Sequence, residues 1–130
     1  MRASMIFLLA LTSGMTLLGC SASDPHPTYP VSGTVTYDGK PIESGTIVFD
    51  PVDGEGPSAM GDIKNGTITA EVSAGDKIVR VSAVRTLDKK DQYGEAITES
   101  YIPDKHNGMS KHQETIKADD TNNLVIDLDK

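Results

Sequence analysis

Apolar and polar residues alternate along most of the chain, and no segment beyond residue 30 carries apolar residues at helical spacing. Runs with a period of two, separated by turn residues at intervals of roughly 8–12 positions, are typical of an all-β sandwich or barrel. We therefore expect a fold of seven strands, at 31–37, 42–50, 61–64, 67–72, 77–85, 112–118 and 123–129.

The alternation also predicts which face of each strand is buried, because successive side chains of a strand point to opposite faces. In the last run, Leu124, Ile126 and Leu128 are expected to face the core, and Val125 is expected to face solvent. The same reasoning gives the other expected core positions: Val31, Gly33, Val35, Tyr37, Ile47, Phe49, Ile68, Ala70, Val72, Val79, Val81 and Ala83.

Two dipeptides predict tight hairpins between these strands. Asp38-Gly39 and Asn65-Gly66 suit a type I′ turn, which needs positive φ at both central residues. Pro51 ends the strand before it, since proline offers no N–H to a ladder. The last two strands are expected to pair with each other across residues 119–122.

Residues 86–110 show no sustained period. Loops longer than roughly 12–15 residues are uncommon and are usually either functional or disordered. We expect a long crossover between edge strands here, with room for one short strand or helical turn, held to the domain by Tyr101-Ile102-Pro103.

The N-terminal segment has a different pattern. Arg2 is followed by a largely apolar run over residues 5–18, and Gly19 precedes Cys20, the one cysteine of the chain. A positive start, an apolar centre and a small residue at the cleavage site form a secretory signal. A retained transmembrane helix would need roughly 20 apolar residues, whereas this run spans only residues 5–18.

A lone cysteine cannot form an internal disulfide, so an exported chain with Cys20 at its cleavage site needs another use for the thiol. With the cysteine at this place, the segment resembles a bacterial lipoprotein signal. The resemblance implies that Cys20 carries a diacylglyceryl group and an N-acyl chain such as palmitate, and becomes the first residue of the mature protein. Two such signals are what stable membrane anchoring requires. The alternative is an ordinary secretory signal that leaves the Cys20 thiol free.

These patterns divide the chain into a lipoprotein signal peptide at 1–19, a lipidated Cys20 with a proline-containing tether over 20–30, and a β-sandwich domain at 31–130. The 111 residues that remain after the signal suffice for one domain with a stable core. Prolines in the tether favour an extended path of about 3.1 Å per residue.

The charge of the chain narrows its partners. The net charge is −7, and removal of Arg2 with the signal leaves −8. An acidic domain repels nucleic acid and anionic lipid head groups. We therefore expect no nucleic-acid partner, contact with a membrane through the acyl chains on Cys20, and any protein partners to be proteins of the envelope.

The first two expected strands carry a more specific pattern. Residues 31–42 read Val-Ser-Gly-Thr-Val-Thr-Tyr-Asp-Gly-Lys-Pro-Ile and are followed by Gly-Thr-Ile-Val-Phe at 45–49. This stretch resembles the opening of carboxypeptidase-regulatory-like domains, which small bacterial envelope lipoproteins often carry. Residues 74–79 and 101–105 are also similar to segments of such lipoproteins. The resemblance implies a seven-stranded antiparallel Greek-key sandwich, transthyretin-like or Ig-like, that has no enzymatic activity.

Transthyretin-like folds include hydroxyisourate hydrolases, so an enzymatic function is one alternative. That family ends in Tyr-Arg-Gly-Ser, whereas this chain ends in Leu128-Asp129-Lys130. The two histidines of the domain, His106 and His112, lie in or beside the irregular segment, and their spacing specifies neither a general base nor a zinc site. We expect no catalytic residues, no enzyme and no cofactor.

Two acidic clusters are weak candidates for calcium, which takes six to eight oxygen ligands. Asp50, Asp53 and Glu55 fall in a glycine-rich loop, and Asp119, Asp120 and Asn122 fall in a turn. Because Asp and Asn are favoured in turns in any case, turn formation alone accounts for these residues. A calcium-binding or small-ligand module of the cell surface remains the alternative function.

Aromatic residues are few, which makes Tyr93 and Tyr101 the candidate binding-surface residues. Tyr101 is also a candidate anchor of the long loop. The expected function is that of a membrane-anchored cell-envelope lipoprotein whose domain serves a structural or protein-binding role.

Overall fold

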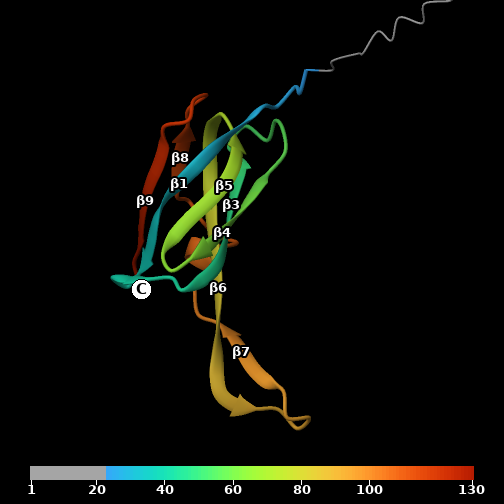
Figure 1. The fold of residues 1–130 in the computed structure, drawn as a ribbon, viewed down its shortest axis with the longest axis vertical. Helices are drawn as coiled ribbons and strands as arrows, with labels where there is room; N and C mark the ends of the chain where they lie inside the picture. The colour runs from blue at the N-terminus through green and yellow to red at the C-terminus, as the bar shows by residue number, and fades with distance from the viewer. Residues whose placement is uncertain (1–22) are drawn as a thin grey trace, which may run out of the picture.

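The computed structural model describes residues 23–130, and nearly all of its regular structure is β (Figure 1). One 3₁₀ turn, η1 (Asp104–His106), is the single helical element among the described residues, so the expected all-β class is confirmed. The strands are β1 (Thr28–Tyr37), β2 (Lys40–Pro41), β3 (Ser44–Pro51), β4 (Ala59–Lys64), β5 (Thr67–Ser73), β6 (Gly75–Lys90), β7 (Ala96–Ser100), β8 (Gln113–Ile116) and β9 (Asn122–Leu128).

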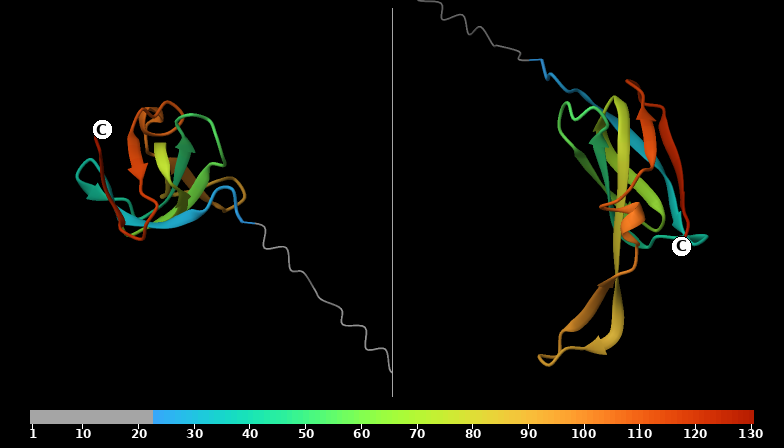
Figure 2. Two further views of the ribbon diagram at one scale, coloured as in Figure 1. Left: turned by 90° about the horizontal axis from the view of Figure 1, so that it is seen from above. Right: turned by 180° about the vertical axis from the view of Figure 1, so that it is seen from behind.

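These strands belong to one sheet that curls around the core (Figure 2). The sheet runs from β9 through β1, β5, β4 and β3 to β6, and β6 pairs with β8 along its first residues and with β7 along its last. Both expected hairpin turns are present, with φ of 51° and 74° at Asp38 and Gly39 and of 50° and 75° at Asn65 and Gly66.

The edges of the sheet differ from the expectation. β9 pairs with β1 in parallel, from Val31↔Asn122 to Tyr37↔Leu128, and β8 pairs with β6. The prediction that the last two strands pair with each other was therefore wrong. The prediction that all strands are antiparallel was wrong as well, because β1 and β9 are parallel. Instead, β8 and β9 are edge strands on opposite sides of the curled sheet. The Asn122 side chain ties the start of β9 to the residue after β8, because it accepts from Lys117 N at 2.8 Å and donates to Lys117 O at 2.9 Å.

Gly33 makes the parallel pairing possible. Its φ is +153°, and a Cβ at this position would lie 2.1 Å from the carbonyl oxygen of Leu124 on β9. Any side chain here would therefore collide with the backbone of the neighbouring strand, and only glycine lets β1 and β9 approach this closely.

The core matches the predicted alternation. The expected positions are buried except Tyr37, which is half-buried against the core, and Ile42, Ile63, Ile102 and Ile116 are buried in addition. Val125, predicted to face solvent, is 77% exposed. The predicted inward and outward faces of these strands are thus confirmed, since a shift of the pattern by one residue would exchange them.

Nine strands replace the expected seven, the additions being β2 and β7. The expected long loop of residues 86–110 is largely regular: β6 continues to Lys90, turns at 91–95 and pairs back with β7. Its ladder with β3 stops at Ala83, so residues 84–100 leave the curled sheet as a two-stranded hairpin, here called the arm. The arm projects from one end of the molecule (Figure 1), and none of its side chains is buried.

The chain enters the fold at the opposite end. β1 begins at Thr28, three residues earlier than expected, so residues 28–30 of the expected tether are part of the sheet. In Figure 1 and in the right view of Figure 2, the chain arrives beside the β3–β4 loop and the β5–β6 turn, and the arm extends the other way.

Candidate functional site

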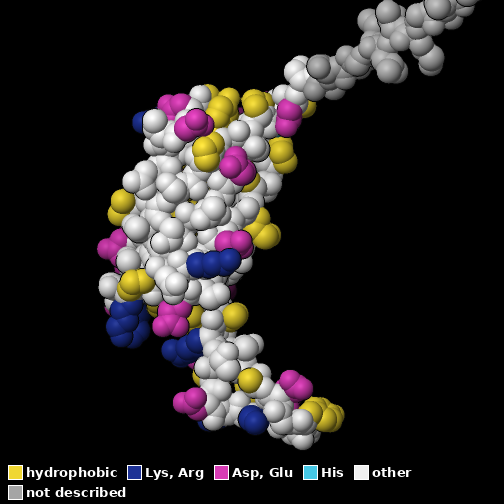
Figure 3. All heavy atoms as spheres, viewed as in Figure 1, with side chains coloured by type: hydrophobic (Ala, Val, Ile, Leu, Met, Phe, Trp, Pro, Cys, Tyr) yellow, Lys and Arg dark blue, Asp and Glu magenta, His cyan; other side chains and the backbone are white. Residues whose placement is uncertain are grey.

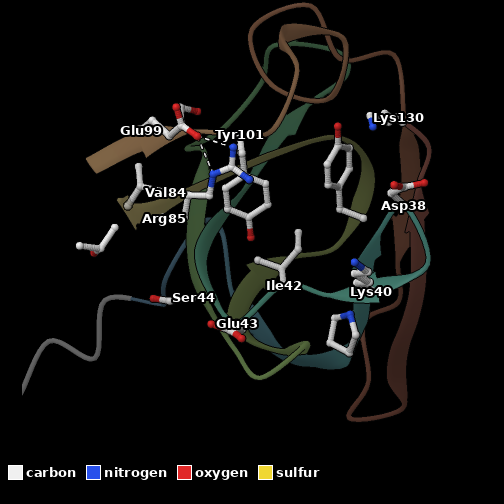
Figure 4. Close-up of a pocket in the computed structure, with 14 residues that line it drawn as sticks. Asp38, Lys40, Ile42, Glu43, Ser44, Val84, Arg85, Glu99, Tyr101 and Lys130 are labelled. Carbon is white, nitrogen blue, oxygen red and sulfur yellow. Dashed lines mark hydrogen bonds and ion pairs between the residues drawn. The ribbon is translucent and has the colours of Figure 1, made fainter. Parts of the chain in front are cut away.

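A groove of about 910 Å³ lies where the arm leaves the curled sheet (Figure 4). One wall is the base of the arm, from Val84 to Thr86 and from Glu99 to Tyr101. The other wall is the β1–β2 turn with the segment that leads into β3, and the chain end at Lys130 closes one side. The groove therefore combines three segments that are far apart in sequence.

Aromatic rings and an aliphatic side chain form the base of the groove. The ring centroids of Tyr37 and Tyr101 are 5.9 Å apart at an interplanar angle of 54°, an arrangement that favours aromatic pairs. Ile42 is buried beneath them. Burial, and next to it the negative charge of Glu43, raises the pKa of the Tyr101 hydroxyl above its usual 10.0, although Arg85 acts in the opposite direction.

Arg85 holds the arm to this base. Its guanidinium donates from Nε to Glu99 Oε1 at 2.6 Å across the β6–β7 ladder, and a second guanidinium nitrogen pairs with the same carboxylate (Figure 4). The guanidinium carbon also lies 5.8 Å from the centre of the Tyr101 ring, within cation–π range. In addition, Tyr101 N donates to Ala83 O at 3.3 Å. These contacts fix the base of the arm to the curled sheet.

The opposite wall of the groove offers both signs of charge. Asp38, Lys40, Glu43 and Lys130 surround the opening (Figure 4). None of their side chains is buried, so each can exchange its water for a partner's polar group at little cost. With two aromatic rings below and charged groups around the rim, the groove suits contact with a protein surface or peptide segment.

The histidines lie outside the groove lining and have separate partners. His106 Nε2 lies 2.6 Å from the carbonyl oxygen of Asp129, and its ring meets Tyr37 edge-on at 6.5 Å. Lys105 Nζ donates to the Asp129 carboxylate at 2.9 Å, and this hydrogen bond lowers the pKa of Asp129 below 3.8. His112 instead pairs with Glu114 at 2.8 Å. These contacts fix η1 and β8 and do not bring the two histidines to one site.

Two of the three calcium candidates of the first loop have protein partners, and the third, Glu55, has an exposed side chain. Asp50 accepts from Arg80 Nε and Ser58 Oγ, each at 2.5 Å, and the hydrogen bond from Arg80 lowers its pKa below 3.8. Asp53 accepts from the amide of Glu55 at 2.9 Å.

The candidates of the second loop also close a turn. Asp119 accepts from Thr121 N at 2.8 Å, and the Asn122 amide bridges to Lys117, while the Asp120 side chain is exposed. Within residues 23–130 there is no group of three or more His, Cys, Asp or Glu side chains placed to hold a metal ion.

The two candidate tyrosines have different positions. Tyr101 is half-buried against the core at the base of the arm, a position that suits the expected anchor. Tyr93, in contrast, is 80% exposed at the tip. Sequence reasoning missed Arg85, Glu99 and Lys40. The pairing of Arg85 with Glu99 follows only from the register of the β6–β7 hairpin, which the sequence of residues 86–110 does not indicate because it lacks a sustained period.

Cys20 and the expected signal at 1–19 lie outside the described residues. Among those described, no helix is long and apolar enough to cross a membrane. Comparison with protein families and with curated proteins gives no match. Among solved structures, a 9R-lipoxygenase from Cyanothece PCC8801 aligns over 79% of this chain and 16% of its own length, at 14% identity and a TM-score of 0.36. The chain thus spans about a sixth of that enzyme.

Proposed function

We propose that this protein is a bacterial envelope lipoprotein, held in a membrane by acyl chains on Cys20, whose β domain binds another envelope protein through the arm and the groove at its base. The observation that carries the proposal is that the chain entry and the arm lie at opposite ends of the fold. The described chain enters the fold at one end, and the arm with its groove lies at the other. An anchored domain of this shape presents the arm away from the membrane.

The composition of the arm supports a role in binding. An isolated two-stranded hairpin is marginal in water, and this one has no buried side chain of its own. It nevertheless exposes Tyr93 and Val84, the latter 59% exposed at the edge of the groove. A protein that covers these side chains gains roughly 25 cal/mol for each Å² of apolar surface removed from water.

The same features argue against simple edge-to-edge association. Charged residues occupy much of the arm, and the β6–β7 register shifts between Thr86 and Lys90, both of which hinder pairing with another strand. Figure 3 shows acidic and basic side chains along the narrow projection. Side-chain recognition at the groove and the tip is therefore the mode we propose, with no catalytic step.

We also propose that the domain is related to carboxypeptidase-regulatory-like domains. The motif at 31–49 supports this relationship. Those domains form a Greek-key sandwich, which is a more specific architecture than a curled β-sheet. The two strands of the motif, β1 and β3, contribute core residues and the turn that lines the groove. Kinship of this kind suggests a location and does not by itself fix a function.

Anchoring and binding are tested separately. Cys20→Ser should move the protein from the membrane fraction to the soluble fraction, and mass spectrometry of the wild type should find acyl chains on an N-terminal Cys20. Continued membrane retention of the variant would refute the anchor.

For binding, a photo-crosslinking amino acid at Tyr93 in intact cells should give one discrete protein adduct. The matched probe at Met60, which is 72% exposed on the curled sheet, should give none. Equal adducts from both positions would refute the arm as the binding element.

A further inference from the structure

Lys77 is a buried cation without an anionic partner. It is 3% exposed and shares the core face of β6 with Val79 and Val81. Its Nζ donates to Ser73 Oγ at 2.9 Å, yet no carboxylate of residues 23–130 forms an ion pair with it. A buried ammonium is costly unless it is both paired and hydrogen-bonded, so this position calls for an anion.

The nearby carboxylates are engaged elsewhere. Glu114 faces Lys77 in the β6–β8 register, but its carboxylate pairs with His112 at 2.8 Å. Asp76, next in the chain, accepts from Thr115 Oγ1 at 2.6 Å. Both carboxylates, adjacent to Lys77 in the ladder and in the chain, thus have other partners, and neither forms an ion pair with the ammonium group.

Lys77 lines a cavity of about 180 Å³ at the end of the curled sheet where the chain enters, which we call the mouth. Tyr29 and Ser73 line it together with Lys77, and the segment Pro25–Pro27 borders it. The His26 ring lies against Gly56, where a Cβ would come within 3.1 Å of Nδ1. At roughly 30 Å³ for each water, the mouth has room for a molecule of about six heavy atoms.

The rim of the mouth has the opposite charge. Asp53, Glu55 and Asp76 line the same cavity. Asp53 and Glu55 are exposed and belong to the β3–β4 loop, so they stand at the opening and the ammonium of Lys77 lies inside. A simple anion would be attracted by Lys77 and repelled by the rim, whereas a ligand with both charges is complementary to both.

We propose that the mouth binds a small amino carboxylic acid, with its carboxylate on the Lys77 ammonium group and its own ammonium group toward Asp53 and Glu55. This site is at the opposite end of the molecule from the groove and does not depend on the proposed protein partner.

The test is thermal unfolding of the full chain in non-ionic detergent, with glycine, acetate or methylammonium added at matched ionic strength. A ligand that binds only the native state raises the unfolding temperature saturably, by roughly 5–10 °C at ten times its Kd for a domain of this size. We expect this rise with glycine, a smaller one with acetate and none with methylammonium. Equal effects of glycine and acetate would overturn the two-charge site, and no effect of either would overturn the site altogether.

Two variants locate the effect. Lys77→Met keeps the aliphatic stem and removes the charge, so the glycine response should disappear, while Lys64→Met, an exposed lysine on β4, should retain it. A glycine response that survives in Lys77→Met would refute the site. The double variant Asp53→Asn with Glu55→Gln changes only exposed side chains, and it should reduce the advantage of glycine over acetate even if Lys77→Met does not fold.

Discussion

Arg80 on β6 and Asp50 on β3 form an ion pair across the sheet, with Arg80 Nε 2.5 Å from Asp50 Oδ2. The pair links the residue before Pro51 to the longest strand, and Ser58 Oγ adds a hydrogen bond from the far side of the β3–β4 loop. Asp50, considered first as a calcium ligand, thus fixes the ends of a loop.

This pair predicts a pH dependence of stability. The hydrogen bond from Arg80 lowers the pKa of Asp50 in the folded state, so the pair stabilises the fold above the ordinary pKa of 3.8 and is lost as pH falls through the lower, folded value. Because both side chains are partly exposed, Asp50→Asn should cost no more than about 1 kcal/mol at pH 7.

The measurement is the free energy of unfolding by urea at pH 7 and at pH 2.5. The gap between wild type and Asp50→Asn should narrow at the lower pH. The control Asp62→Asn, on exposed β4 surface, should show a constant gap near zero. A gap for Asp50→Asn that is the same at both pH values would contradict the role of the ionised pair.

The faces of β9 give a second prediction. Ile126 is 1% exposed and the adjacent Val125 is 77% exposed. Ile126→Asp places an unpaired charge in the core and should remove most of a stability of about 5–15 kcal/mol, and Val81→Asp should do the same. Val125→Asp should change stability by less than about 0.5 kcal/mol. Circular dichroism during urea titration measures all three, and a stable Ile126→Asp protein would mean that β9 is packed differently.

The third prediction tests the close approach of β1 and β9 at Gly33. Gly33→Ala drives a methyl group into the Leu124 carbonyl, so β9 must move away from β1, at a cost of about 2 kcal/mol or more. Gly108→Ala is the matched control, because a Cβ there meets nothing within 4 Å. Hydrogen exchange should show faster exchange in residues 122–128 for Gly33→Ala alone. Unchanged exchange there would count against the parallel pairing.

The fourth prediction tests whether Tyr101 anchors the base of the arm. Tyr101→Ala removes the ring that contacts both Tyr37 and Arg85, so the amides of residues 84–100 should exchange more rapidly while the curled sheet keeps its protection. Tyr101→Phe keeps the ring and should leave the arm unchanged, and so should Tyr93→Ala at the exposed tip. If Tyr93→Ala loosens the arm as much as Tyr101→Ala, the anchor has been assigned to the wrong residue.

Local pattern was enough to predict the strands that cover the core. A half-buried strand alternates, and the Asp-Gly and Asn-Gly turns adopt the positive φ that their residues favour. Alternation tells which face is buried but not which strand is the neighbour, so the parallel contact of β1 with β9 could not be found in this way. The arm was missed for a related reason: with no buried face, β7 has no reason to alternate.

The candidate sites also divide into features that the local sequence indicates and features that depend on distant segments. Tyr101 was recognised because aromatic residues are scarce and it stands beside Ile102, which is buried. The groove was not recognised, since its walls come from three distant segments. Lys77 did leave a signal in the sequence, because it is in phase with Val79 and Val81 on the core face of its strand.

The parallel contact between β1 and β9 has a consequence for biogenesis. Val31 and Asn122 are partners in this pairing, so the first strand gains its last neighbour only after residues 122–128 have been delivered. Contacts between such distant segments slow folding, because a large loop must close before they form. Under the export proposed above, that delay would help the chain to stay unfolded until it has crossed the membrane, because the sheet closes slowly.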